Sequence, residues 1–75
     1  MPPRILLSME PGMLVIAKRS RVVVDGVEKS LVTCDLERMT VQYLFHLGAD
    51  NEFIRSGICK DLRIRHNMNV DILME

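Results

Sequence analysis

The chain has 75 residues, of which 48% are hydrophobic and 27% are charged. This length allows one small globular domain and excludes a second, because domains usually need about 50 to 250 residues. Ten basic and ten acidic residues give no formal net charge, which argues against a uniformly basic arm, an acidic tail or a disordered polyelectrolyte. No apolar stretch approaches the roughly 20 residues that cross a bilayer, so we expect no membrane partner.

The two cysteines, Cys34 and Cys59, have neither a CxxC spacing nor a Cys/His cluster around them. This favours reduced thiols over a disulfide scaffold or a structural zinc site. We therefore expect a cytoplasmic protein that holds no metal and no other cofactor.

Three prolines fall within residues 1–11, which we expect to form an extended N-terminal arm. Residues 13–17 are continuously apolar and lie between Gly12 and a basic run, which predicts a buried strand. Asp25-Gly26 follows a β-branched run and supplies the positive φ angles that a two-residue hairpin turn requires. The returning strand is expected over residues 30–34.

The clearest alternation lies in residues 40–47, which predicts a half-buried strand. The inward face of this strand carries Val41, Tyr43, Phe45 and Leu47. The outward face carries Thr40, Gln42, Leu44 and His46.

The last third of the chain predicts short elements. Turn residues at 48–51 lead into an expected strand at 52–55, which would complete a second hairpin. Ile58 and Leu62 are four residues apart, which predicts a single helical or 3₁₀ turn. Residues 62–65 alternate as a short closing strand is expected to do.

These elements predict an all-β fold, a small antiparallel barrel of five to six short strands with one helical or 3₁₀ turn. The barrel would cover residues 12–66, after the arm at 1–11 and before a C-terminal strand or tail at 67–75. Closure is favoured because it removes exposed sheet edges. The pattern leaves an alternative open, which is an open sheet with one short helix.

Three segments resemble parts of the SH3-like superfold, the small β-barrel shared by Sm-like, Tudor and KOW modules. Residues 11–15 (Pro-Gly-Met-Leu-Val) resemble the opening strand of Tudor and KOW domains. Residues 35–41 resemble the turn into the central strand of Sm-like and Tudor barrels, and residues 52–58 resemble the late strand and its 3₁₀ turn. The resemblance implies an SH3-like barrel, which hosts RNA binding, recognition of protein tails or structural roles.

Catalytic arrangements do not stand out in the sequence. His46 and His66 lack a local Ser, Cys or Asp at the spacing of a nucleophile and its base. The four glycines are too dispersed to form a phosphate-binding loop. We therefore expect a binding module that is not an enzyme.

The basic residues form two clusters in the sequence. One lies within residues 18–21 and the other within the last third of the chain. If the first and last barrel strands are neighbours, as closure requires, the clusters together present phosphate-binding donors. This predicts binding of RNA or another nucleic acid through Lys18, Arg19, Arg21, Arg55, Lys60, Arg63 and Arg65. A solvated rim balanced by acidic residues is the alternative.

Apolar residues near both ends are difficult to bury in so small a barrel. They include Ile5, Leu6, Leu7, Ile72 and Leu73. We expect them to pack against a second subunit or a protein partner, by adding strands to an exposed sheet edge. This gives the alternative function, a protein-interaction adaptor or structural subunit. A homo-oligomer is expected because a core this small gains stability from a partner.

Overall fold

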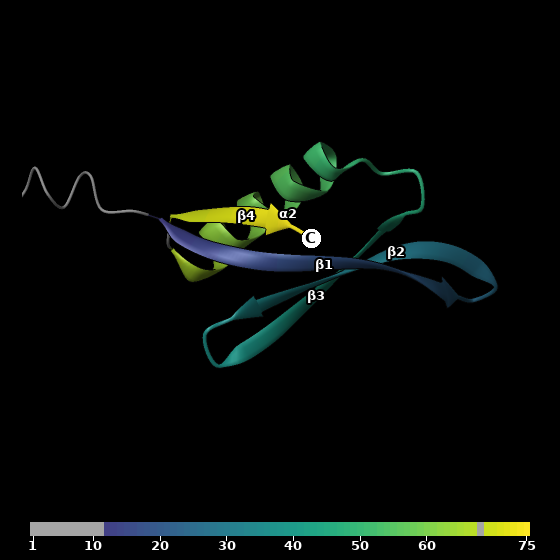
Figure 1. Cartoon of the computed structure of the whole chain (residues 1–75), viewed down its shortest axis with the longest axis horizontal. Coiled ribbons are helices and arrows are strands. Elements are labelled where there is room, and N and C mark those ends of the chain that lie inside the picture. The colour runs from purple at the N-terminus through teal and green to yellow at the C-terminus, as the bar shows by residue number, and fades with distance from the viewer. Residues whose placement is uncertain (1–11, 68) are drawn as a thin grey trace, which may run out of the picture.

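The computed structural model describes residues 12–67 and 69–75. It contains one four-stranded sheet and one helix that lies over one side of it (Figure 1). In chain order the elements are β1 (Met13–Val24), β2 (Val27–Leu36), β3 (Met39–His46), α2 (Asn51–His66) and β4 (Val70–Met74).

The strands lie in the order β3-β2-β1-β4. The first three form an antiparallel meander, whereas β4 pairs with β1 in the parallel direction. Parallel strands need a long crossover connection, and α2 supplies it by carrying the chain from β3 at one edge to β4 at the other. The segment for which a C-terminal strand or tail is expected contains β4, which is part of the sheet.

Both hairpins turn within two residues. Asp25 and Gly26 have φ angles of 52° and 79°, and two successive positive values are typical of the type I′ turn that matches strand twist. The predicted Asp-Gly hairpin is therefore confirmed. In the second hairpin Arg38 has a φ of 71°, and strands β2 and β3 meet at the pair Leu36 and Met39.

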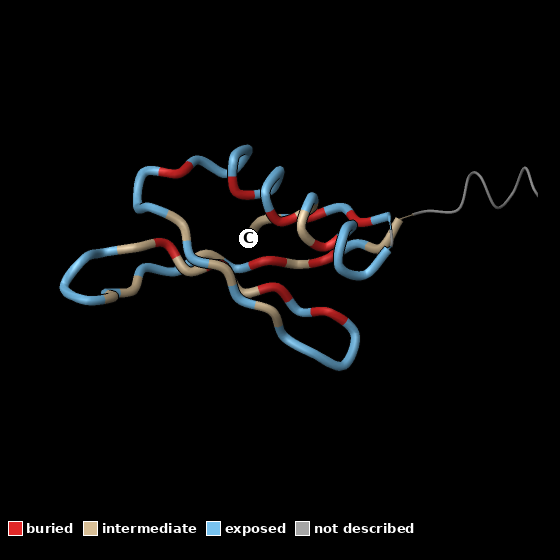
Figure 2. The backbone as a smooth tube through the Cα atoms, turned by 180° about the vertical axis from the view of Figure 1, so that it is seen from behind, coloured by how far each residue is buried: buried red, intermediate tan, exposed pale blue. Residues whose placement is uncertain are grey.

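The core lies between the sheet and α2. Every second strand residue faces the helix. On α2, the residues packed against the sheet are Ile54, Ile58 and Leu62, which are four residues apart and fully buried. Buried segments gather where α2 lies over the strands, whereas the hairpin ends are exposed (Figure 2). The sheet contributes Val15, Ala17, Val32, Cys34, Leu36, Val70 and Ile72.

The strands expected at residues 52–55 and 62–65 are wrong, because both segments belong to α2. The side chain of Asp50 caps this helix by accepting a hydrogen bond from the Phe53 N–H at 2.8 Å. The helix ends at Asn67, which adopts the left-handed conformation with a φ of 49°. The single turn expected between Ile58 and Leu62 is part of this 16-residue helix.

The sheet is not closed into a barrel. The fold is mostly β with one helix, so the all-β prediction is correct only in part. Closure would require strands in the segment that forms α2. The architecture is instead an open sheet with one helix, which is the alternative that the sequence leaves open. Because the sheet stays open, β3 and β4 are its two edges.

Gly12 permits the close approach of β1 to the segment before β4. A Cβ atom added there would lie 2.9 Å from the backbone oxygen of Asn69. We expect Gly12→Ala to lower the free energy of unfolding by about 1–3 kcal/mol, because backbone must move. Gly48→Ala is the control, since its added Cβ would meet nothing closer than 3.7 Å. Equal urea midpoints for the two variants would contradict this.

Candidate protein-interaction site

Backbone hydrogen bonds show whether the N–H and C=O groups of each β1 residue point toward β2 or toward β4. The Met13 N–H donates to the Asn69 carbonyl at 2.7 Å, and the Ala17 carbonyl accepts from the Glu75 N–H at 2.8 Å. Odd-numbered residues of β1 therefore direct their backbone toward β4. Because the direction alternates along a strand, even-numbered residues of β1 direct theirs toward β2.

The pairing of residues between strands shows which backbone groups of β2 and β3 bond to which neighbour. Lys18 lies opposite Thr33, so odd-numbered residues of β2 bond to β1 and even-numbered ones bond to β3. Cys34 lies opposite Val41, so the odd-numbered residues of β3 are the ones bonded to β2. The N–H and C=O groups of Thr40, Gln42 and Leu44 consequently point out of the sheet.

The outer edge of β3 pairs with no strand among residues 12–67 and 69–75. Natural sheets protect such edges with Lys, Pro, bulges or covering elements. Strand β3 reads Met-Thr-Val-Gln-Tyr-Leu-Phe-His and contains neither Lys nor Pro. Met39 and Leu44 on this strand remain about half exposed, at 51% and 52%. The edge is therefore open to pairing with another strand.

A groove of about 890 Å³ lies between this edge strand and the side of α2. Both faces of β3 contribute to the lining. Tyr43 and Phe45 come from the face toward α2, and Gln42 and Leu44 come from the opposite face. The lining includes Met39, Tyr43 and Phe45 from β3 and Gly57, Asp61 and Arg65 from α2.

One polar cluster spans the groove. The Tyr43 hydroxyl donates to Asp61 Oδ2 at 2.7 Å, and Arg65 Nε donates to Asp61 Oδ1 at the same distance. The hydrogen bond from Tyr43, followed by that from Arg65, lowers the pKa of Asp61. Burial, with the Asp61 carboxylate beside it, raises the pKa of Tyr43, so its hydroxyl stays a donor. This cluster ties α2 to the edge strand.

An aromatic contact holds the other end of the groove. Phe45 and Phe53 meet edge to face with ring centroids 6.1 Å apart. Gly57 lies between the two ends of the groove, where an added Cβ would sit 3.6 Å from Phe45. Glycine in a helix interior costs roughly 1 kcal/mol relative to alanine. Gly57 therefore lowers the intrinsic stability of the helix, and its missing side chain leaves space between α2 and β3.

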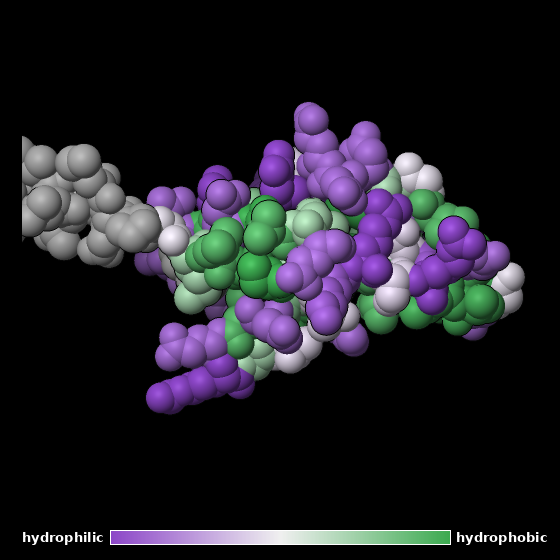
Figure 3. All heavy atoms as spheres, viewed as in Figure 1, coloured by the Kyte–Doolittle hydropathy of each residue, from purple (hydrophilic) through white to green (hydrophobic). Residues whose placement is uncertain are grey.

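Other exposed apolar side chains lie away from this groove. Leu14 and Leu73 contribute to the apolar patch that Figure 3 shows over β1 and β4, and Val23 and Val27 are exposed near the β1–β2 turn. Strand β4 is also an edge, but it has five residues against eight in β3. Only at β3, within the described residues, does a free edge adjoin the groove.

Arg19, one of the predicted nucleic-acid ligands, holds structural elements together. Its guanidinium donates to Ser30 Oγ at 2.9 and 3.1 Å, to the Leu47 carbonyl at 3.0 Å and to Asn51 Oδ1 at 3.3 Å. Ser30 is a buried polar residue, so this contact satisfies its hydroxyl. Arg19 therefore connects β1 to β2 and to the start of α2.

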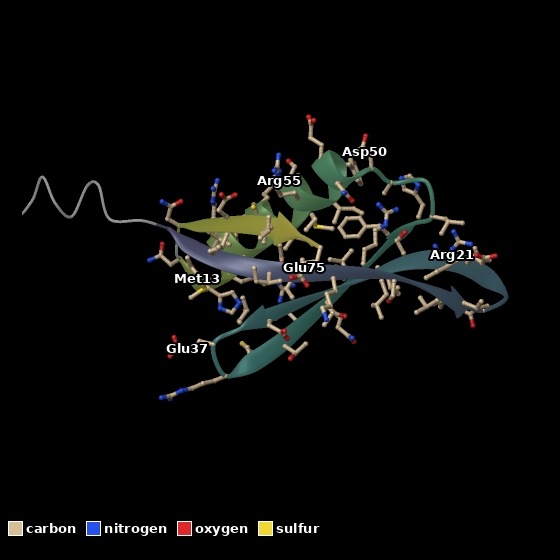
Figure 4. All side chains as sticks on the ribbon, in the orientation of Figure 1. Met13, Arg21, Glu37, Asp50, Arg55 and Glu75 are labelled. Carbon is tan, nitrogen blue, oxygen red and sulfur yellow. The ribbon has the colours of Figure 1, made fainter. Side chains whose placement is uncertain are left out.

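The other predicted ligands are distributed over different elements. Arg21 pairs with Glu28 at 3.5 Å, and Arg63 donates to the Val70 carbonyl at 3.0 Å. Lys18 is exposed on β1, while Arg55, Lys60 and Arg65 are exposed on α2. Figure 4 shows Arg21 on the β1–β2 hairpin, well apart from Arg55 on the helix.

The structure does not place Arg19 beside Arg63 and Arg65, as the expected barrel would. Arg19 contacts Asn51 at the start of α2, whereas Arg63 and Arg65 lie in its last turn. Arg63 is twelve residue steps along the helix from Asn51, which corresponds to about 18 Å along the axis. The expected proximity assumed that residues 62–65 form a strand beside β1, and their helical conformation removes that basis.

The predicted partner-binding residues have different positions. Ile5, Leu6 and Leu7 lie outside the described residues. Ile72 is 3% exposed and packs in the core, whereas its neighbour Leu73 is exposed. Sequence reasoning missed Met39 and Gly57 as surface features of one groove, although it placed Gln42 and Leu44 on the outward face.

The thiols and the metal-binding side chains form no further site. Cys34 and Cys59 are both free, and burial raises the pKa of the Cys34 thiol to about 11. In the part of the chain that the structure describes, no three His, Cys, Asp or Glu side chains are grouped to hold a metal ion. No helix in that part is long and apolar enough to cross a membrane.

Comparison with known proteins found no matching family model, no matching curated protein and no matching solved structure.

The contact between Tyr43 and Asp61 gives a testable prediction. Tyr43→Phe should lower the free energy of unfolding by about 1–2 kcal/mol at neutral pH, because it removes a hydrogen bond to a charged group. The pKa of Asp61 is lowered in the folded chain, so this stabilisation is present above the unfolded carboxyl pKa of about 4 and is lost as the pH falls below it. Urea unfolding at a series of pH values measures the difference. A difference that does not shrink under acid conditions would contradict the assignment.

Proposed function

We propose that this protein is a non-enzymatic protein-interaction module that binds an extended strand at the outer edge of β3. The observation that carries the proposal is the outward direction of the Thr40, Gln42 and Leu44 backbone beside an apolar groove. In β-strand addition, the main chain supplies affinity, and pockets for alternate side chains supply specificity. Here the added strand would bond to the outward backbone groups of β3, and every second side chain of it would lie on the side of the sheet that carries the groove.

The basic residues support nucleic-acid binding less well. Several of them already bond within the chain, to Ser30, Glu28, Asp61 and the Val70 carbonyl. Single-stranded nucleic acid usually stacks on exposed aromatic side chains. Tyr43 and Phe45 lie on the side of the sheet that faces α2, and Phe53, although 57% exposed, lies on α2. The open face of the sheet therefore carries no Phe, Tyr or Trp ring for stacking.

The polar groups of the groove also favour binding over catalysis. Asp61 is held as an ionised acceptor by two donors, which makes it a poor general base. Tyr43 has a raised pKa and keeps its proton, which makes it a poor nucleophile. Both side chains instead fix the position of α2 over the edge strand.

Gln42→Pro tests this function directly. Proline removes the outward N–H of residue 42, and edge strands tolerate it because no bond to β2 is lost. The probe is a synthetic peptide of alternating valine and threonine with lysine at its ends. Its binding to dilute protein is followed through the fluorescence of Tyr43, which is the only tyrosine in a chain without tryptophan. We expect the affinity to fall about tenfold to a hundredfold, the cost of one unmade hydrogen bond.

Two further variants complete this experiment. Gln42→Ala keeps the backbone N–H and should bind the peptide nearly as well as the unmodified chain. Gly57→Leu leaves the edge intact but fills the groove, and leucine favours the helix more than glycine does, so the variant should fold and yet lose binding. Equal peptide binding by all four proteins, or binding by none, would overturn the proposal.

A further inference from the structure

Given the proposed strand addition at β3, we infer that the added strand is β3 of a second copy of this chain. The two strands run antiparallel about a two-fold axis that passes beside Gln42. The product is a continuous sheet of eight strands, with β3 of each copy at its centre and β4 at each end.

The backbone pattern of β3 matches that of its own antiparallel copy. In an antiparallel pair, residues that exchange hydrogen bonds face each other at alternate positions. With Gln42 opposite Gln42 of the second copy, Thr40 faces Leu44 of that copy and Leu44 faces its Thr40. All three residues direct their backbone outward. Every outward group of this stretch thus meets an outward group of the partner strand.

The side chains allow the same register. No charged side chain lies between Met39 and Phe45, so no like charges face each other across the pair. The Gln42 amide donates one hydrogen bond to Thr33 Oγ1 at 3.2 Å, and its second N–H and its oxygen can bond to an identical amide beside the two-fold axis. On the helix side, Val41 faces Tyr43 of the second copy, a pairing of β-branched and aromatic side chains that stabilises adjacent strands.

The groove lies next to the second strand. It is lined by β3 and by one side of α2, so the helix-side residues of a strand added at the outer edge of β3 would border it. Gly57 lacks a side chain on the α2 side of the groove. Two-fold symmetry places β3 of each copy beside the groove of the other, so the partner strand borders both grooves. Met39 and Leu44, now half exposed, become covered.

The arrangement closes at two copies. The interface is isologous, since the same edge serves both partners, and such contacts form closed dimers. After pairing, the exposed edges are the two β4 strands of five residues each. A neutral, unprotected and longer edge is thereby replaced by two short ones, which are less prone to further pairing.

Light scattering coupled to size-exclusion chromatography tests the inference on the full chain over a range of concentrations. We expect a mass of twice the 8.6 kDa of one chain, falling to one chain for Gln42→Pro, while Gln42→Ala remains dimeric. A monomer at every concentration would overturn the inference. A dimer that survives Gln42→Pro would overturn it as well, because another surface must then hold the copies together.

Disulfide trapping tests the register. In a Cys59→Ser background, Gln42→Cys should form a covalent dimer on mild oxidation, because opposed residues on paired strands lie about 5.5 Å apart at Cα. Thr33→Cys is the matched control, since Thr33 neighbours Gln42 on β2 and lies one strand inward. Equal crosslinking of the two variants would overturn the register. If the chain is monomeric yet still binds the peptide probe through Gln42, the inference fails and the proposed function stands.

Discussion

The packing of one helical stripe against the sheet determines the rest of this structure. Ile54, Ile58 and Leu62 form the buried face of α2, and a single 16-residue helix is too narrow to cover four strands evenly. The chain must then return to β4 beside β1. Strand β3 is left at the far edge, where only the side of α2 reaches it, and the groove is the consequence.

The contacts along that groove hold the side of α2 next to the edge strand β3 and leave the space between the two elements open. Tyr43 and Asp61 join the two elements at one end, and Phe45 and Phe53 join them at the other. Gly57 keeps the span between them open. The same residues that stabilise the domain therefore keep the backbone of β3 accessible, which is the physical basis of the proposed strand addition.

The sequence predicted those features that depend on local chemistry. Asp25-Gly26 requires positive φ angles, and the alternation around Gln42 has a period of two, so both hairpin and strand were correctly placed. The sequence does not indicate the helix, because Gly57 interrupts its interior and the Asp50 cap acts over only three residues. The open edge was not predictable, since it depends on β4 pairing with β1 across the whole chain.

Residue-resolved amide hydrogen exchange by NMR tests the central claim, that the outer edge of β3 is the binding surface. In dilute samples the amides of Gln42 and Leu44 should exchange rapidly, while those of Val41 and Tyr43 are protected by their bonds to β2. Occupation of the edge, by concentrating the protein or adding the peptide probe, should protect Gln42 and Leu44 selectively. Unchanged exchange at Gln42 and Leu44 under both conditions would contradict the claim.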